Sequence, residues 1–206
     1  MLRAGRRPRV QVSPALPVLL AAFALLASPP VLAAVLTAAA CHELGHYAAL
    51  RRCGGRVESL RLTALGAVMD VGSTARLSYG REMGIVLAGP GANLLLAASL
   101  AALGRRWEAA WLPAGAHLVL GVFNLLPILP LDGGRLLWLA AARLTEPFTA
   151  DRAAAAVGLA CSGALALGGV LLTCRAGGSP FLLIGALGLL GANLREMGLV
   201  KTASAG

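Results

Sequence analysis

The chain has 206 residues, of which 58% are hydrophobic and 13% charged, with a mean hydropathy of +0.77 and a formal net charge of +9. A soluble domain carries about 25% charged residues, so an ordinary water-soluble globule is excluded and the bilayer is the expected solvent. The basic residues flank apolar runs instead of forming one stripe, which argues against a nucleic-acid-binding protein and favours membrane topology. The four cysteines form no CxxC pair, so they are read as small packing residues.

The N-terminus resembles a signal peptide, because basic residues precede an apolar stretch. Apolar sequence continues to about residue 50, which instead predicts a basic cytoplasmic segment, 1–13, followed by a retained first helix at about 14–28. The pair Pro29-Pro30 is expected to end that helix, since proline lacks a backbone donor and restricts the residue before it. A second span follows at about 31–52.

The segment 54–72 is too polar for a span and too apolar for an ordinary loop. Apolar residues recur along it between polar ones, with glycines at 54, 55, 66 and 72, which predicts a short β-hairpin or a re-entrant loop. Such backbone is tolerated at membrane depth only when it is buried in protein or lines a watery cavity. An amphipathic cytoplasmic loop is equally compatible with the pattern.

Four further spans are predicted at about 81–103, 107–126, 151–174 and 180–194, because a spanning helix needs about 20 mostly apolar residues. A break at 127–130 separates the fourth from a short helix at 132–143. The expected fold is therefore an all-α integral membrane protein with six transmembrane helices in one domain, 14–199, and a cytoplasmic tail, 200–206. This division places fifteen of the 18 basic residues on the side of the two termini, which agrees with the positive-inside rule.

Residues 42–46 form an HExxH motif in the second predicted span. Positions i and i+4 share one face of a helix, so His42 and His46 can hold one metal ion while Glu43 acts on a water molecule as a general base. The alternative is a helix that happens to carry polar residues. Ionisable groups at membrane depth cost several kcal/mol and usually mark function, so the metal site is the stronger interpretation.

A catalytic zinc usually has three protein ligands, and HExxH supplies two. The main candidates for the third are Asp132 and His117. Asp132 follows a proline-rich break and precedes two glycines, although it could instead be the N-cap of the next helix. His117 stands alone in the fourth span, where a structural or hydrogen-bonding role is more common than metal binding. Asn93, surrounded by apolar residues, is expected to hydrogen-bond between helices.

Two motifs together give the sequence its family resemblance. HExxH in an early span and the stretch from Asn124 to Gly134, with the pattern NxxPxxPLDGG, resemble the site-2 protease family of intramembrane zinc metalloproteases. The stretch 88–93, Ala-Gly-Pro-Gly-Ala-Asn, is similar to a recurrent part of that family's third span. The compact layout most resembles the sporulation factor IVFB branch, without the CBS domain that its members often carry.

The resemblance implies one Zn²⁺ ion per chain, with His42, His46 and Asp132 as ligands and Glu43 as the general base. It also implies that Asn124 lies near the site and polarises the scissile carbonyl or stabilises its oxyanion, although Asn124 could instead be a helix C-terminal cap. The implied partners are a membrane-tethered protein substrate, such as a transcription-factor precursor, and a membrane inhibitor or regulator. No nucleic acid is expected, and the implied location is a bacterial cell membrane.

HExxH lies close to the end of the second span, five to nine residues before Arg51. At 1.5 Å per residue this places the metal roughly 8–14 Å below the cytoplasmic headgroups. A metal transporter and a non-catalytic membrane scaffold are the rival functions. A transporter would carry ionisable residues on several helices and a scaffold would lack the base or a ligand, whereas this chain concentrates such groups at one place.

Overall fold

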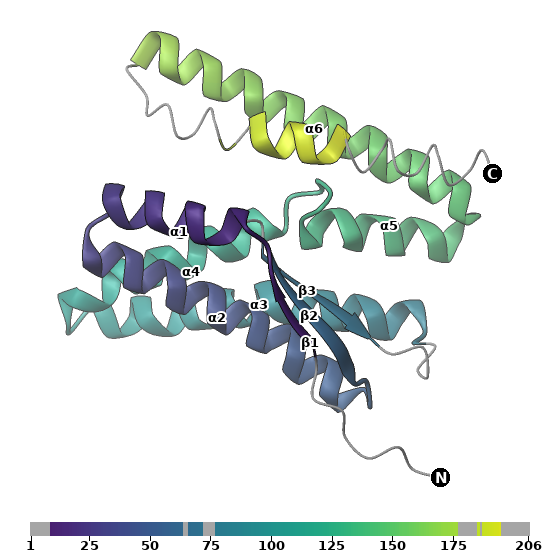
Figure 1. Ribbon diagram of the computed structural model, residues 1–206, viewed down its shortest axis with the longest axis horizontal. Coiled ribbons are helices and arrows are strands. Elements are labelled where there is room, and N and C mark those ends of the chain that lie inside the picture. Colours follow the sequence, from purple (N-terminus) through teal and green to yellow (C-terminus); the bar gives the residue numbers. More distant parts are fainter. Residues whose placement is uncertain (1–8, 64–65, 72–76, 177–184, 186, 195–206) are drawn as a thin grey trace. The chain divides into compact units, whose positions relative to one another are not determined.

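The computed structural model describes residues 9–63, 66–71, 77–176, 185 and 187–194, and Figure 1 shows its helices and strands. The chain divides into two compact units, Met1–Val122 and Phe123–Gly206, and each is described by itself. The first contains β1 (Arg9–Val12), α1 (Ala15–Leu26), α2 (Pro29–Arg52), β2 (Val57–Thr63), β3 (Gly66–Val71), α3 (Tyr79–Gly104), the 3-10 turn η1 (Glu108–Ala110) and α4 (Trp111–Asn124) up to the boundary in its last turn. The second contains α5 (Asp132–Leu144), α6 (Pro147–Ala176) and a helical stretch at 187–194.

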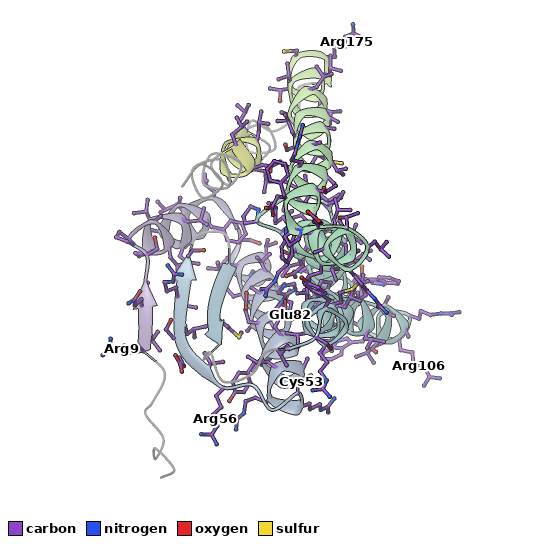
Figure 2. The ribbon with its side chains drawn as sticks, turned by 90° about the vertical axis from the view of Figure 1, so that its right-hand side faces the viewer. Arg9, Cys53, Arg56, Glu82, Arg106 and Arg175 are labelled. Atoms are coloured by element: carbon purple, nitrogen blue, oxygen red, sulfur yellow. The ribbon has the colours of Figure 1, made fainter. Side chains whose placement is uncertain are left out.

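Proline and glycine set the ends of α2, the helix that carries HExxH. Pro29 and Pro30 occupy its first positions after Ser28 at the N-cap, where the missing N–H groups have no helical partner to lose. At the other end Gly54 adopts φ +79° and the Gly55 amide donates to the Leu50 carbonyl at 3.0 Å, as in a glycine-terminated helix. Figure 2 shows Cys53 and Arg56 together at this end, with the Arg56 side chain pointing outwards.

A three-stranded sheet of order β1-β2-β3 lies beside α2 and α3 in the first unit (Figure 1). β2 and β3 are antiparallel, with Thr63 opposite Gly66 and Leu60 opposite Met69, so the predicted hairpin at 54–72 is confirmed for its described residues. β1 pairs in parallel with β2, Arg9 opposite Ser59. The prediction of an all-α protein with a plain basic segment at 1–13 is therefore wrong at residues 9–12, because the strand partner of this segment lies far along the chain.

Small residues bring α2 and α3 together, and these two helices form the most extensive helix–helix contact in the described chain. A Cβ added to Gly45 of α2 would lie 2.5 Å from the Ala88 carbonyl oxygen and 3.1 Å from the Ala92 methyl group of α3. Glycine is therefore required at position 45 for this approach. Without a hydrophobic drive between helices in lipid, such close contacts supply the dispersion energy that holds them together.

The second unit has its own apolar core around the loop between α4 and α5. Ile128, Leu131 and Leu189 are buried there against one another, with Leu126 and Cys161 packed beside them. Hydrogen bonds also link this unit's helices: the Trp138 indole donates to Asp151 at 2.5 Å, and the Asn193 amide donates to the Ser162 hydroxyl at 3.5 Å. The loop that precedes Asp132 is thus anchored within its own unit.

Two described helices are long and apolar enough to span a membrane, α3 and residues Pro147–Arg175 of α6. The predicted helices at 14–28, 31–52, 81–103, 107–126, 132–143 and 151–174 each correspond to a helix of the structure, with ends that differ by a few residues. α1 is a shorter apolar helix, and part of the predicted span at 180–194 lies outside the described residues. The number of six spans stays a prediction.

Candidate metal centre

The two histidines of HExxH lie on one face of α2, one turn apart. Their Nε2 atoms are 3.0 Å apart, and their rings meet edge to face with centroids 4.6 Å apart. Two nitrogens bound to one tetrahedral zinc, each at about 2.0–2.1 Å, lie about 3.3 Å from each other. The histidine pair therefore already has nearly the spacing of two ligands to a single ion.

A backbone carbonyl orients His46. Its Nδ1 atom lies 2.8 Å from the carbonyl oxygen of Ile85 on α3. A carbonyl can only accept, so Nδ1 carries the proton and donates, and the lone pair of the neutral ring is on Nε2. Such a bond to the second ring nitrogen fixes the tautomer that binds a metal.

The ring of His46 lies directly against the backbone of Gly89 on α3. A Cβ at Gly89 would overlap the Nε2 edge of this ring. Gly89 is buried and is followed by Pro90, which lies inside α3 and removes one backbone donor from it. Only glycine leaves room for the imidazole at this place.

A chain of buried polar side chains leads away from His42. The Asn93 Nδ2 atom is 3.4 Å from His42 Nδ1, and Asn93 Oδ1 is 3.1 Å from Nδ1 of His117 on α4. Asn93 is 0% exposed, His117 2% and His42 6%. The prediction that Asn93 hydrogen-bonds between helices is confirmed, and the hydrogen-bond partner of His117 here is Asn93.

Glu43 lies on α2 close to the start of β3. A Cβ at Gly66, the first residue of β3, would be 3.5 Å from Glu43 Oε1, and Gly66 has φ +129°. Glu43 is half-buried, whereas His42 beside it is buried. The hairpin therefore brings backbone next to the carboxylate that is expected to act as the base.

Asp132 and Asn124 belong to the second unit. Asp132 is the first residue of α5 and is half-buried, while Leu131 holds the N-cap position with no side-chain cap. The alternative that Asp132 is the N-cap is therefore wrong. Gly133 and Gly134 follow, and a Cβ on either would overlap backbone of the loop at 125–129. Asn124 ends α4 and is half-buried.

The residues on α2 fit a zinc ion. The donors are two imidazoles, a ligand type that suits zinc, and the tautomer of His46 directs its Nε2 towards His42. Of the residues that support this pair, Ile85 and Gly89 were not predicted from the sequence. Together with Asn93 they follow one another every four residues along α3, so they share one face of that helix.

Comparisons with known proteins agree with this geometry. A model of peptidase family M50 matches residues 30–109 and 106–166, about two thirds of the chain. Rip3 of Mycobacterium tuberculosis, described as a zinc metalloprotease, is 43% identical over 105 residues, which are 46% of this chain and 26% of Rip3. The zinc metalloprotease MJ0392 of Methanocaldococcus jannaschii is 30% identical over 105 residues, 47% of this chain and 30% of that protein. The matches thus span less than a third of these relatives.

The fold is shared with a solved structure. The site-2 protease from Methanocaldococcus jannaschii superposes with a TM-score of 0.67 at 20% identity, covering 91% of this chain and 90% of that one. The family resemblance that the sequence motifs predicted is confirmed, while the IVFB branch stays a prediction. By the extent of the family match, this chain belongs to peptidase family M50.

Proposed function

We propose that the chain is an intramembrane zinc metalloendopeptidase that hydrolyses a peptide bond of a membrane-tethered protein. The observation that carries the proposal is the pair His42 and His46, with Nε2 atoms 3.0 Å apart and the tautomer of His46 fixed by the Ile85 carbonyl. Membership of a peptidase family and relatives described as zinc metalloproteases support zinc as the metal.

In this proposal each side chain of the site has a separate task. Zinc, when bound, supplies a Lewis acid that polarises the scissile carbonyl and makes water more acidic. His42 and His46 hold it from one face of α2, and Asp132 is the third ligand. Glu43 accepts a proton from the attacking water and delivers it to the amine that leaves. Asn124 donates from its amide to the carbonyl oxygen of the scissile bond, which becomes negatively charged when water attacks the carbonyl carbon.

The choice of Asp132 as third ligand rests on its chemistry and its local structure. A carboxylate completes the set of three protein ligands that catalytic zinc usually has. Asp132 is the first residue of α5 and does not occupy its N-cap position, where Leu131 stands, so N-capping does not explain this aspartate. Gly133 and Gly134 let the preceding loop pack directly on the start of α5, which fixes the backbone that carries Asp132.

The hydrolysed bond lies near the cytoplasmic face, in a bacterial membrane with both termini of the chain inside. The position of HExxH close to Arg51 and Arg52 at the end of α2 supports this depth, as does the distribution of basic residues. The substrate is a membrane-tethered transcription-factor precursor, whose helix unfolds locally because a protease needs extended backbone at the metal. The family resemblance supports adding a membrane-bound inhibitor or regulator to the proposed partners.

Cleavage by the purified chain tests the proposed function. We expect the detergent-solubilised protein to contain one zinc per chain and to cut a single-span reporter protein. A strong chelator abolishes cleavage, and added zinc restores it. Cleavage that persists after the zinc has been removed, or a wild-type protein that binds no zinc, would refute the proposal.

Asp132→Asn is expected to weaken zinc binding strongly, because the change keeps the size of the side chain but removes the anionic ligand. Loss of a ligand should exceed the roughly 10–100-fold cost of changing a residue that only supports one. Zinc affinity measured by competition with a chromophoric chelator checks this. Asp151→Asn is the matched control, because Asp151, near the start of α6, accepts a hydrogen bond from Trp138 of α5 and has no proposed role at the metal. A zinc affinity of Asp132→Asn as high as that of the wild type and of this control would remove Asp132 from the site.

Gly66→Ala should lower cleavage by roughly tenfold while zinc content stays normal. The added methyl group would stand 3.5 Å from Glu43 Oε1. A rise of about 1.4 kcal/mol in the activation free energy lowers the cleavage rate tenfold. Gly66 also begins β3, the edge strand with which we expect an extended substrate to pair, as peptides do when they add a strand to a sheet. Steady-state cleavage and zinc analysis provide the measurement.

Gly54→Ala is the matched control for this prediction. Gly54 also has a positive φ, +79°, but a Cβ there meets nothing within 4 Å. Both substitutions therefore strain the backbone, and only the one at Gly66 adds an atom beside Glu43. A similar loss of cleavage in both variants would mean that strain alone explains the effect and that the hairpin does not act at the base.

A further inference from the structure

Two hydrogen bonds connect His42 to Asn93 and Asn93 to His117. A metal bound to His42 would decide which group donates and which accepts in each. A histidine that binds through Nε2 is neutral and carries its proton on Nδ1. His42 Nδ1 then donates, so the atom of Asn93 that faces it must be the amide oxygen. An amide has nearly the same shape with oxygen and nitrogen exchanged, and the hydrogen bonds decide its orientation. The oxygen accordingly turns to His42 and the NH₂ group to His117.

The direction of the hydrogen bond between Asn93 and His117 follows from that between His42 and Asn93. With its NH₂ group towards α4, Asn93 donates to Nδ1 of His117, 3.1 Å from the amide in the structure. That nitrogen must accept, so His117 carries its proton on Nε2 and is neutral. His42 and His117 thus have opposite tautomers, and one amide between them enforces both.

Close packing makes this arrangement rigid. His117 and Gly121 are buried on the same face of α4, one turn apart. A Cβ on Gly121 would lie 3.2 Å from the Asn93 side chain, so α4 approaches α3 closely at this amide. A buried amide group without a hydrogen-bond partner is destabilising, so every rotamer of Asn93 that breaks either bond is disfavoured.

We propose that Asn93 and His117 are positioning residues, which hold His42 in the Nδ1-protonated tautomer so that its Nε2 lone pair is directed at the zinc. This inference rests on the proposed function. It also completes a symmetry: α3 orients His46 with the Ile85 carbonyl and His42 with the Asn93 amide. Both zinc histidines thereby donate their second N–H to an oxygen atom on the same helix, the pattern that raises ligand basicity.

Zinc affinity in matched variants tests the role of Asn93. Asn93→Leu should weaken zinc binding roughly 10–100-fold, and His117→Phe should weaken it by a smaller factor. Asn93→Asp should restore affinity, because a carboxylate oxygen accepts from His42 Nδ1–H equally well. Asn193→Leu is the control: Asn193 is also 0% exposed and bonds Ser162 in the second unit, so its loss should leave zinc affinity unchanged.

The tautomers give a readout that a merely structural role would not produce. The chain has three histidines, so a sample labelled with ¹⁵N-histidine shows three imidazoles in NMR spectra. In the zinc-loaded wild type we expect the proton on Nδ1 of His42 and His46 and on Nε2 of His117. A proton on Nδ1 of His117, or unchanged zinc affinity in Asn93→Leu, overturns this inference alone. A wild type without zinc overturns the proposed function and this inference with it.

Discussion

Glu43→Gln is expected to lower the rate of peptide-bond cleavage by about 10²–10⁴-fold, the usual contribution of a general base. Glutamine keeps the size of the side chain but has no carboxylate to take the proton from water. Zinc content should remain at one per chain, because His42, His46 and Asp132 are unchanged. Single-turnover cleavage of a reporter protein and metal analysis of the same preparation give the two numbers.

Glu108→Gln provides the control for this experiment. Glu108 is exposed in the short 3-10 turn between α3 and α4, so its loss of charge should change neither cleavage nor zinc content. Equal cleavage by wild type and Glu43→Gln would show that Glu43 is not the base. Loss of zinc in Glu43→Gln would show that it acts on the metal site itself.

The same pair of measurements separates a protease from its rivals. A metal transporter would bind zinc and move it across the membrane without cutting any peptide bond. Glu43→Gln would then alter zinc uptake into vesicles. A non-catalytic scaffold would show no cleavage in the wild type. The presence of a glutamate beside two oriented histidines, together with an aspartate in the LDGG stretch, is what favours the protease.

The helices were predictable because their signals are local. The apolar runs are long, and Pro29, Pro30 and the glycine at 54 mark the ends of α2 in the sequence itself. β1 carries no such signal: it is four residues long, and all four are exposed. Its pairing with β2 depends on residues far along the chain, which a pattern read over a short window cannot reveal.

The placement of the two histidines was predictable for a similar reason, and the placement of the residues around them was not. The spacing of HExxH already places His42 and His46 on one face of a helix. The bond from His46 to Ile85 involves a backbone carbonyl, which every residue possesses, so no side-chain pattern can mark it. Gly89 was visible in a recurrent stretch, but only the packing of α2 on α3 shows that its missing side chain makes room for His46.

Gly89→Ala is therefore expected to abolish most of the activity, although it replaces none of the proposed zinc ligands. The new methyl group would overlap the His46 ring where its Nε2 atom lies, so the ring must move or α2 and α3 must separate. A displacement of about 1 Å at a catalytic group can cost 10²-fold in rate, and overpacking typically costs about 1–3 kcal/mol of stability. Zinc affinity should fall together with cleavage, which distinguishes this variant from Glu43→Gln.

Gly91→Ala separates this local effect from a general response of α3 to alanine. Gly91 lies two residues further along the same helix, and a Cβ there meets nothing within 4 Å. Alanine should stabilise the helix at either position by up to about 1 kcal/mol through its higher propensity, so the two variants differ only in what the methyl group meets. Normal zinc affinity in Gly89→Ala would show that the His46 ring has another position from which it can bind the ion. Reduced affinity in Gly91→Ala as well would instead mean that α3 tolerates no alanine in this stretch. Loss confined to Gly89→Ala would show that the metal site depends on a residue with no side chain, because His46 needs the space that Gly89 leaves.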